Sequence, residues 1–491
     1  MADTSVLGIT ERRSGISLPL LVGLGVFVLG LVFATKRLED PDILMHIVAG
    51  RWMIAHVALP HADFLSYTAT GAAWVTHEWI GEIATALAYD AAGWHGLVTL
   101  AAFCFALSFA LFARALLRVY RPSHALIVTL AALPVIVPHW LARPHVFAMP
   151  ILLLWLSLLV EARRENRAPP LWAALLMVPW VNLHGSFLIG LGMAGVLWLE
   201  AMLTTDGEAE RIRAATAWIA FLAASFAATL VTPLGLEAYL LPLRLMHMKF
   251  ALSMLVEWKS FDFQTVPPLT VWLLLVLGIA LRQGLRLPLS RLLIVLLLLH
   301  MALKYARHAE MLVLAGPMLA GPALAPQLRA AGGAAFARLD RWLGDLAAPA
   351  GGAAMLSAAI LMLTACLVAT RTPIAMPERY TPIAAVRAVE EHGIPGPVLN
   401  AYNFGDYLIF SGIPTFIDGR ADMYDDAFIE RHYHAVYGES DQLPALLAEY
   451  HVAWTLFEAD SPAVVQLDRM PGWRRLYSDD VAVVHIRDDA K

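Results

Sequence analysis

The sequence predicts a polytopic α-helical membrane protein, with about 11 transmembrane helices and a small C-terminal α/β domain. Apolar residues make up 59% of its 491 residues and charged residues only 15%, and the mean hydropathy is +0.64. Apolar stretches of the length that crosses a hydrocarbon layer recur along residues 17–371. Beyond Arg371 the pattern changes to short strand-like and helix-like segments.

The expected spans follow from these apolar stretches. The first, at 17–35, follows Arg12 and Arg13 and has no small-residue cleavage site, so we expect it to be retained rather than removed as a signal peptide. The other ten lie at 94–117, 124–142, 145–160, 171–187, 188–204, 214–233, 268–282, 288–304, 309–325 and 353–371.

The distribution of Lys and Arg predicts the orientation, because cytoplasmic connections are enriched in these residues. With the N-terminus inside, the cytoplasmic connections hold most of the basic residues of the loops, and they lie at 1–16, 118–123, 161–170, 205–213, 283–287 and 326–352. An odd number of spans then places the soluble domain, 372–491, outside the cytoplasm. The transmembrane domain is 1–371, and its first external loop is 36–93.

The same topology collects the polar stretches of the membrane domain on its external face. These stretches are 36–79, 142–145, 182–186, 232–263 and 304–308. Ionisable groups at membrane depth are costly and usually line a cavity or a pathway, so we expect one shared pocket. The chain has no long basic run, so we expect no nucleic-acid partner.

The first external loop carries a pair of carboxylates. Asp40 and Asp42 flank a proline, which keeps them off the preceding helix. Asp42 stands at the start of a predicted helix, 42–55, where a carboxylate is favoured, and His46 lies one turn further on. The opposite face is apolar, which predicts an amphipathic helix on the outer leaflet; it consists of Leu44, Ile47, Val48 and Trp52. Helix capping alone is the competing explanation of the carboxylate pair.

More polar residues follow in the same loop. Asp63 ends a turn, and His77 and Glu78 stand directly before Trp79. A tryptophan with polar neighbours is also typical of the aromatic belt at a membrane surface, so this second cluster has a structural explanation as well. Its closeness to the carboxylate pair favours a functional one.

The C-terminal segment predicts a small α/β layer fold, because strands alternate with helices. The expected strands are 397–401, 414–418, 452–457 and 481–486, and the expected helices are 381–391, 425–436, 441–450 and 462–468. A polar cluster surrounds one strand end, where ligands bind in open α/β sheets; it consists of Asp406, Asp418, Arg420, Asp422 and Tyr424. We expect it to bind an acceptor or to close over the membrane site, while a buried Asp–Arg structural pair is the alternative.

These motifs resemble the GT-C class of membrane glycosyltransferases, and within it a bacterial branch. The residues that carry the resemblance are 40–46, 60–63, 77–79, 143–144, 180–186, 232–235, 257–258, Arg307, 403–408 and 416–424. The chain departs from the branch pattern at Met45, where an aromatic is common, and at Thr232, where Asn is common. Neither position carries a group that we expect to be catalytic.

The resemblance implies transfer of a sugar from a polyprenyl-phosphate donor to an extracytoplasmic glycan, lipid or protein, with inversion. An acidic residue of the first external loop would act as general base, and we favour Asp40, because Asp42 is committed to the helix. Cationic or donating groups would stabilise the departing phosphate, and the candidates are Arg143, His145, His184, Arg307 and His308. The other expected substrate-binding residues are His46, Asp63, His77, Glu78, Asn182 and Glu257. The resemblance also implies a bacterial inner membrane and contact with its lipids.

Other interpretations stay open. Mg²⁺ or Mn²⁺ on Asp40 and Asp42 fits the ligand type, but we expect no resident metal. Arg143 and Arg307 also suit contact with lipid headgroups, and the histidines suit hydrogen bonds between helices. A flippase for a lipid-linked glycan, or an inactive assembly partner of the same fold, are the competing functions. A transporter usually places ionisable residues near mid-bilayer and shows internal repeats, and neither feature is seen.

Overall fold

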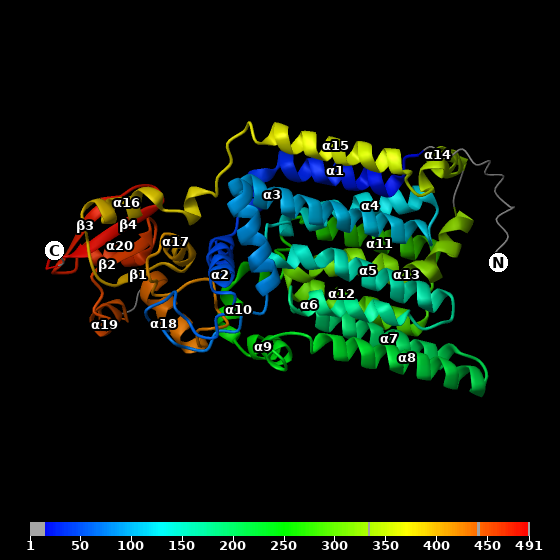
Figure 1. Ribbon diagram of the computed structural model, residues 1–491, viewed down its shortest axis with the longest axis horizontal. Helices are drawn as coiled ribbons and strands as arrows, with labels where there is room; N and C mark the ends of the chain where they lie inside the picture. The colour runs from blue at the N-terminus through cyan, green and yellow to red at the C-terminus, as the bar shows by residue number, and fades with distance from the viewer. Residues whose placement is uncertain (1–14, 332–333, 439–441, 490–491) are drawn as a thin grey trace.

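The computed structural model describes residues 15–331, 334–438 and 442–489. A bundle of long helices carries a small domain with a β-sheet at one end (Figure 1). The bundle helices are α1 (Leu18–Val32), α3 (Trp79–Leu117), α4 (Pro122–Ile136), α5 (Pro144–Arg164), α6 (Met177–Val181), α7 (Phe187–Thr204), α8 (Glu208–Thr229), α11 (Pro268–Gln283), α12 (Leu289–Lys304), α13 (Ala309–Ala331) and α15 (Gly352–Ala369). Arg12 and Arg13 lie outside the described residues.

Within the described residues, seven helices are long and apolar enough to cross a membrane. They cover 79–117, 122–139, 144–164, 187–204, 208–229, 306–328 and 352–369, and shorter apolar helices cover 18–32, 171–181 and 268–283. The protein is therefore a multi-pass membrane protein. Each predicted span coincides with a helical segment, while the total of eleven crossings and their orientation stay predictions.

Prolines and tryptophans shape the bundle. Pro122, Pro144 and Pro268 each stand at the first helical position, where the fixed φ of proline suits a helix start. Large aromatic side chains such as Trp140 and Trp155 are fully buried between the helices. Figure 1 shows α15 beside α1 at one edge of the bundle, and α7 with α8 at the other.

Helix α3 contains a sharp bend that was not predicted from the sequence. Ala92 and Gly93 have non-helical backbone angles, and Gly93 has a φ of +57°. A side chain is disfavoured at this φ, so glycine suits the bend. The part of α3 before the bend belongs to the expected external loop, and it supports α2 (Asp42–His56) from one side.

The prediction that α2 is an amphipathic helix on the lipid surface is wrong. Its axis crosses the direction of the bundle helices (Figure 1), but protein covers it, since α3 packs on one side and α17 (Gly405–Phe410) on another. Met45, His46 and Ala49 are buried along with Leu44 and Ile47, while Val48 and Trp52 are partly buried. The apolar face predicted from the sequence is therefore only part of the surface that α2 buries, because the helix is buried on most sides.

The soluble domain is a four-stranded mixed sheet with helices. The strands are β1 (Val398–Asn400), β2 (Trp454–Glu458), β3 (Trp473–Ser478) and β4 (Ala482–Arg487), in the order β1-β2-β4-β3. Strands β1 and β2 are parallel, whereas β4 is antiparallel to both β2 and β3. The helices besides α17 are α16 (Ile383–Glu391), α18 (Asp426–Tyr437), α19 (Gln442–Glu449) and α20 (Pro462–Leu467).

One strand prediction is wrong. Residues 414–418 form no strand of the sheet, and Thr415 makes only an isolated bridge with Ser66 of the first external loop. The segment was predicted as a strand because Phe416 and Ile417 are apolar, and the structure buries both in the domain core. The missed strand, β3, is a largely exposed edge strand whose polar residues gave no apolar signal.

The external loops hold the soluble domain on the bundle. Tyr67 and Thr68 donate hydrogen bonds to the carbonyls of Val398 and Phe416, at 2.8 and 2.5 Å. On the other side, the Asp426 carboxylate accepts backbone N–H groups at the start of α10 (Lys249–Met254). The remaining helices are α9 (Glu237–Leu245) and α14 (Ala334–Gly344), which lie at opposite ends of the bundle in Figure 1.

Candidate functional site

Arg143 joins the two carboxylates of the first external loop. Its guanidinium lies 2.9 Å from Asp40 Oδ2 and 2.7 Å from Asp42 Oδ2. The backbone of Arg143 is extended, and Pro144 starts α5 directly after it, so the side chain leaves the helix end towards the loop. Arg143 and Asp40, about a hundred positions apart in the chain, thus meet where the first loop reaches the start of α5.

Glu257 and Arg307 extend this group into a row of alternating charges. The Glu257 carboxylate lies 3.6 Å from Arg143 and 3.0 Å from Arg307. The Arg307 guanidinium also lies over the ring of Trp258, 4.6 Å from its centre. Burial alone would raise the pKa of Glu257, but the two arginines outweigh it and lower that pKa to about 2. The carboxyl therefore stays ionised at neutral pH.

The expected division of roles between Asp40 and Asp42 is wrong in one respect. Asp40 is not free of the helix: its Oδ1 accepts the backbone N–H of Asp42 at 3.0 Å, so Asp40 caps the start of α2. Both Asp40 oxygens are engaged, whereas the Asp42 side chain is about a fifth exposed. Burial and the charge of Asp40 raise the pKa of Asp42 to about 7, although Arg143 opposes the shift.

Glu78 stands among three imidazoles. Its carboxylate lies 3.9 Å from His46, 3.7 Å from His77 and 3.8 Å from His184. His46 also lies 3.4 Å from Glu82. Burial lowers the pKa of His46, but the carboxylates of Glu82 and Glu78 outweigh it and leave the pKa raised.

The remaining bundle residues take different places. His145 Nε2 lies 3.2 Å from the His139 carbonyl, and the rings of His145 and His184 are 6.2 Å apart. His308 follows Arg307 and packs near Trp258. The Asn182 side chain is fully used in the fold, because its oxygen accepts the Trp79 N–H at 2.7 Å and its amide donates to two backbone carbonyls.

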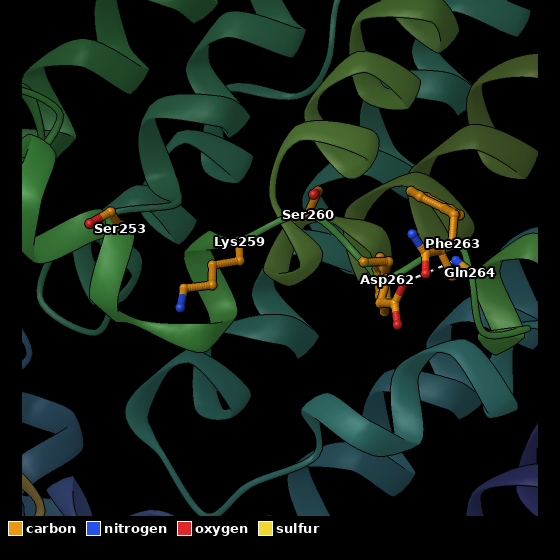
Figure 2. A pocket seen from close by; sticks show the side chains of 7 residues that line it. Ser253, Lys259, Ser260, Asp262, Phe263 and Gln264 are labelled. Carbon is orange, nitrogen blue, oxygen red and sulfur yellow. Dashed lines mark hydrogen bonds between the residues drawn. The ribbon is translucent and has the colours of Figure 1, made fainter.

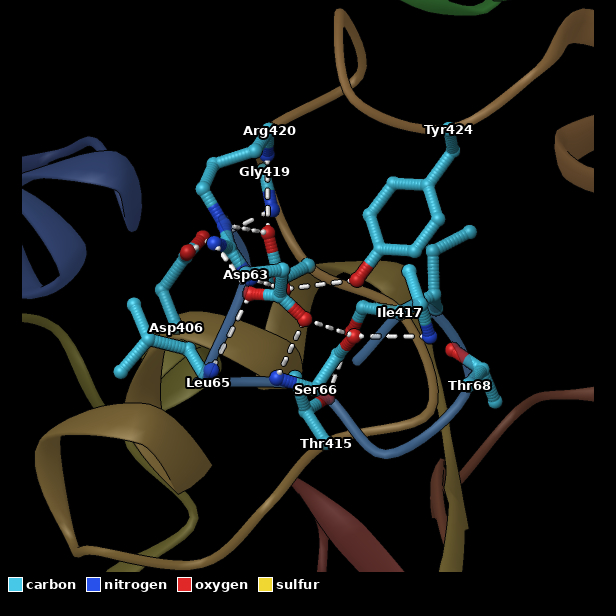
Figure 3. Close-up of polar contacts among 12 residues, drawn as sticks. Asp63, Leu65, Ser66, Thr68, Asp406, Thr415, Ile417, Gly419, Arg420 and Tyr424 are labelled. Atoms are coloured by element: carbon cyan, nitrogen blue, oxygen red, sulfur yellow. Dashed lines mark hydrogen bonds and ion pairs between the residues drawn. The ribbon is translucent and has the colours of Figure 1, made fainter. Parts of the chain in front are cut away.

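Asp63 and the soluble-domain cluster form one buried ionic network (Figure 3). Arg420 lies 2.7 Å from Asp63 and 2.7 Å from Asp418, and all three side chains are almost fully buried. Tyr424 donates a hydrogen bond to Asp418 at 2.8 Å. Asp63 also accepts two backbone N–H groups and a hydroxyl hydrogen bond of its own loop. This network locks the first external loop to the soluble domain.

Asp406 and Asp422 face the membrane-domain residues instead. The backbone N–H of Gly419 donates to Asp406 Oδ1 at 3.3 Å, and Asp42 lies directly against Gly419. Burial raises the pKa of Asp422, against the effect of His77, which indicates that this carboxyl lies near the histidine cluster. The soluble domain therefore contributes acidic groups to the external end of the bundle.

The residues present do not fit a divalent cation on Asp40 and Asp42. The guanidinium of Arg143 already bonds to both carboxylates and supplies the positive charge that a metal would bring. Within the described residues, no group of three or more His, Cys, Asp or Glu side chains has the arrangement of a metal site.

Two acidic residues near the site were not predicted from the sequence. Glu82 lies on α3, one helical turn after Glu78. Because residues one turn apart share a helix face, this spacing could have predicted that Glu82 lies beside Glu78. Glu310 lies just beyond Arg307, and its Oε2 is buried without a hydrogen-bond partner among the described residues. Glu310 was not predicted as a site residue because it lies inside an apolar stretch of the sequence.

A broad hollow of about 850 Å³ opens next to the site (Figure 2). Its lining comes from Ser253 and the segment 259–264, directly after Glu257. The carbonyl of Lys259 accepts the N–H of Ala306 at 2.9 Å, so the hollow lies close to Arg307.

The sequence matches no family model and no curated protein. Several solved structures resemble the fold, including the following three. ArnT from Cupriavidus metallidurans bound to undecaprenyl phosphate aligns with a TM-score of 0.53 and 16% identity, over 95% of this chain and 97% of ArnT. The apo state of ArnT gives a TM-score of 0.50. The apo oligosaccharyltransferase of Archaeoglobus fulgidus gives 0.51 at 11% identity, over 89% of this chain and 70% of that one.

The fold is therefore GT-C-like, as the sequence resemblance implies. The likeness to ArnT runs through nearly the full length of both chains, so it includes the bundle, the external loops and the soluble domain. At these identities the likeness concerns the fold, and the roles of individual residues rest on the geometry above.

Proposed function

We propose that this protein is a membrane glycosyltransferase that moves a sugar from a polyprenyl-phosphate donor to a hydroxyl group of an extracytoplasmic acceptor. The observation that carries the proposal is the charged row of Asp42, Arg143, Glu257 and Arg307 at one end of the bundle. Four separate segments of the chain supply these residues. Their assembly gives a base and phosphate-binding cations in one place. ArnT, whose structure aligns with nearly the whole chain, was solved bound to undecaprenyl phosphate, and this supports a polyprenyl-phosphate donor.

The reaction needs one base and one stabilised leaving group. The acceptor oxygen forms a bond with the anomeric carbon, and its proton passes to a carboxylate. The bond between the anomeric carbon and the phosphate oxygen breaks, and its electron pair leaves with the polyprenyl phosphate. Attack from the side opposite the phosphate inverts the anomeric centre.

Asp42 is the better base of the two carboxylates. Its side chain is more exposed than that of Asp40, and its pKa of about 7 is close to the pH at which a general base works best. Asp40 caps the helix and holds Arg143 in place. Asp40 is therefore a positioning residue in this proposal.

Arg143 and Arg307 are the cations for the leaving phosphate. Both guanidinium groups are partly exposed, and a planar guanidinium matches two phosphate oxygens. Glu257 neutralises both in the absence of donor, so a phosphate would compete with it for the same N–H groups. The hollow lined by Lys259 lies beside the segment of Arg307, because the Lys259 carbonyl accepts the N–H of Ala306, and it offers open space to the donor headgroup on that side.

Transfer assays with purified protein in nanodiscs test the proposal, with a panel of polyprenyl-phosphate sugars and release of polyprenyl phosphate as the readout. We expect turnover that Arg143→Gln reduces by about 10²–10³-fold, because it removes a donor to the leaving group. Arg244→Gln is the matched control, since Arg244 is an exposed external arginine paired with Glu237 away from the row.

A second assay separates the competing functions. If the reconstituted protein moves a labelled lipid-linked glycan between leaflets and cleaves no donor, it is a flippase and the proposal fails. If it does neither with any donor of the panel, while binding to a partner enzyme changes that enzyme's rate, the chain is an assembly partner.

A further inference from the structure

Two carboxylates from different domains face one another across Gly419. A methyl group on Gly419 would lie 2.5 Å from Asp42 Oδ1 and 2.9 Å from Asp406 Oδ2. Real side-chain carbons do not approach oxygens this closely, so a side chain at this position would push the two carboxylates aside. Figure 3 shows Asp406 next to Gly419 and Arg420 in the soluble domain.

The Asp406 carboxyl is buried and incompletely paired. Its side chain is fully buried, and Gly419 N–H donates to Oδ1, but Oδ2 has no hydrogen-bond partner among the described residues. A buried ionised oxygen without a donor is costly, whereas a protonated carboxyl can itself donate. Asp406 Oδ2 is also the oxygen that faces the gap towards Asp42.

We propose that Asp406 shares a proton with Asp42 and thereby positions Asp42 as the base, so that the soluble domain completes the active site. This inference rests on the proposed function for the role of Asp42. Asp406 touches no reacting atom in this proposal and acts only through Asp42. It is therefore a positioning residue.

The surrounding charges leave Asp406 without a cation of its own. Asp42 is faced by Asp40, His46, Arg143, Glu257, Tyr402 and Asp406, and Asp406 is faced by Asp42, Tyr402, Asp418 and Arg420. Arg143 bonds to the first-loop carboxylates, and Arg420 bonds to Asp418 and Asp63. A proton is thus the charge that remains to neutralise the pair.

The ionisation of the pair has a definite order. Burial raises the pKa of Asp406 well above its ordinary value, and the charges of Asp42 and Asp418 raise it further. The pKa of Asp42 is raised to about 7, chiefly by burial and by Asp40. Asp42 bonds to Arg143, whereas Asp406 Oδ2 has no donor among the described residues, so Asp406 is the member of the pair that holds the proton and Asp42 is the carboxylate.

The pair links stability to pH. Both pKa values are raised in the folded protein above the unfolded value of about 3.9. The folded state thus binds more protons than the unfolded state above that pH. The stabilising effect is complete below about pH 4 and is lost as pH rises through 7 and beyond. At alkaline pH two adjacent carboxylates repel each other across the domain junction.

Thermal unfolding of the full chain in nanodiscs tests the shared proton without using activity. Asp406→Asn removes one charge and keeps the shape, so we expect it to raise the Tm at pH 8.5 by about 2 °C and to change little at pH 5.5. Asp480→Asn, an exposed residue of the same domain, should change neither. An equal shift at both pH values would mark a purely structural residue and overturn the proposal.

Two further measurements complete the unfolding experiment. If Asp406→Asn does not fold, Asp42→Asn removes the other partner and should give the same pH-dependent gain. Millimolar Mg²⁺ is added to the wild type at pH 8.5. If it raises the Tm there, but not that of Asp406→Asn, a cation rather than a proton neutralises the pair and the proposal fails.

The pH profile of transfer connects the pair to catalysis. Asp406→Ala removes the protonated carboxyl that donates to the Asp42 carboxylate, so Asp42 should ionise less easily and the midpoint of the rise in kcat/KM should move to higher pH by about one unit. A midpoint that stays in place would show that Asp406 does not act on the base. If no donor is turned over, the proposed function fails, but the unfolding experiment still decides whether the proton is shared.

Discussion

Arg143 is the residue on which the candidate site depends, because it contacts every carboxylate of the charged row. It bonds to Asp40 and Asp42 and lies 3.6 Å from Glu257. Its guanidinium therefore sets where the two first-loop carboxylates point, and it lies where a leaving phosphate would be stabilised. The base and the cation are held as one unit, so changes at either affect the other.

The two first-loop carboxylates should give different losses. Asp42→Asn removes the proton acceptor and should reduce transfer by about 10²–10⁴-fold with little effect on folding. Asp40→Asn keeps an acceptor for the helix cap but loses the charge that pairs with Arg143, so it should cost less than about 1 kcal/mol of stability, with a smaller loss of rate. Transfer kinetics and thermal unfolding on both variants measure these effects. A dead, stable Asp40→Asn beside an active Asp42→Asn would reverse the roles.

Transfer should depend on pH in the way that the pKa of Asp42 dictates. The base accepts a proton only when ionised, so kcat/KM should rise about tenfold per pH unit below 7 and level off above it. Glu257, with a pKa of about 2, stays ionised throughout and contributes no slope. A pH–rate profile from 5 to 9 measures the midpoint, and a profile that falls across this range would exclude Asp42 as the base.

The residues of the row could be predicted from sequence, but their roles could not. Arg143 and Arg307 each stand at the external end of an apolar segment, so hydropathy alone places them at one depth. The roles of Asp40 and Asp42 depend on which oxygen meets the N–H at the start of α2, and that geometry follows from the tertiary packing. Asp63 has the same polarity as these residues, yet it serves the junction with the soluble domain.

At the scale of elements, the junction between the first external loop and the soluble domain holds the site closed. Every predicted span coincides with a helical segment because apolar length is written directly in the sequence. The segment 414–418 was predicted as a strand for the same reason, since burial makes a residue apolar whatever its backbone conformation. Phe416 and Ile417 are buried in the core of the soluble domain without joining its sheet. Contacts between distant elements carry no such local signal.

Loss of the central arginine should open this junction. Arg420→Met leaves the buried carboxylates of Asp63 and Asp418 without their partner, which should destabilise the soluble domain by about 3–5 kcal/mol. Thermal unfolding measures the loss, and limited proteolysis should cut the exposed first external loop. Arg474→Met is the control, because Arg474 is an exposed arginine of β3. Equal stability of both variants would show that the ionic network does not hold the junction.

At the scale of the whole molecule, the described structure has two unlike ends. The site and the soluble domain share one end of the bundle, and α14 lies at the other (Figure 1). A donor anchored in the membrane and an acceptor outside it can meet only at the end that carries the site. The function therefore requires that this end face away from the cytoplasm.

Fusions at the C-terminus test this orientation. We expect alkaline phosphatase fused after Lys491 to be active, and a fluorescent protein that folds only in the cytoplasm to stay dark, because the basic connections favour the opposite side. The same reporters fused between α4 and α5 and between α5 and α6 provide internal controls of alternating sign. A fluorescent C-terminal fusion would place the site in the cytoplasm and remove its access to an extracytoplasmic acceptor.

The ion pair between Asp63 and Arg420 joins residues that are synthesised at very different times. The two residues are 357 positions apart, and a ribosome makes the first long before the second. Until the last sixth of the chain has been synthesised, Asp42 lacks both Gly419 and Asp406 beside it. A prematurely terminated chain would insert its helices yet carry an unfinished site. Under the proposed function, the site is therefore complete only once the residues around Gly419 have been made.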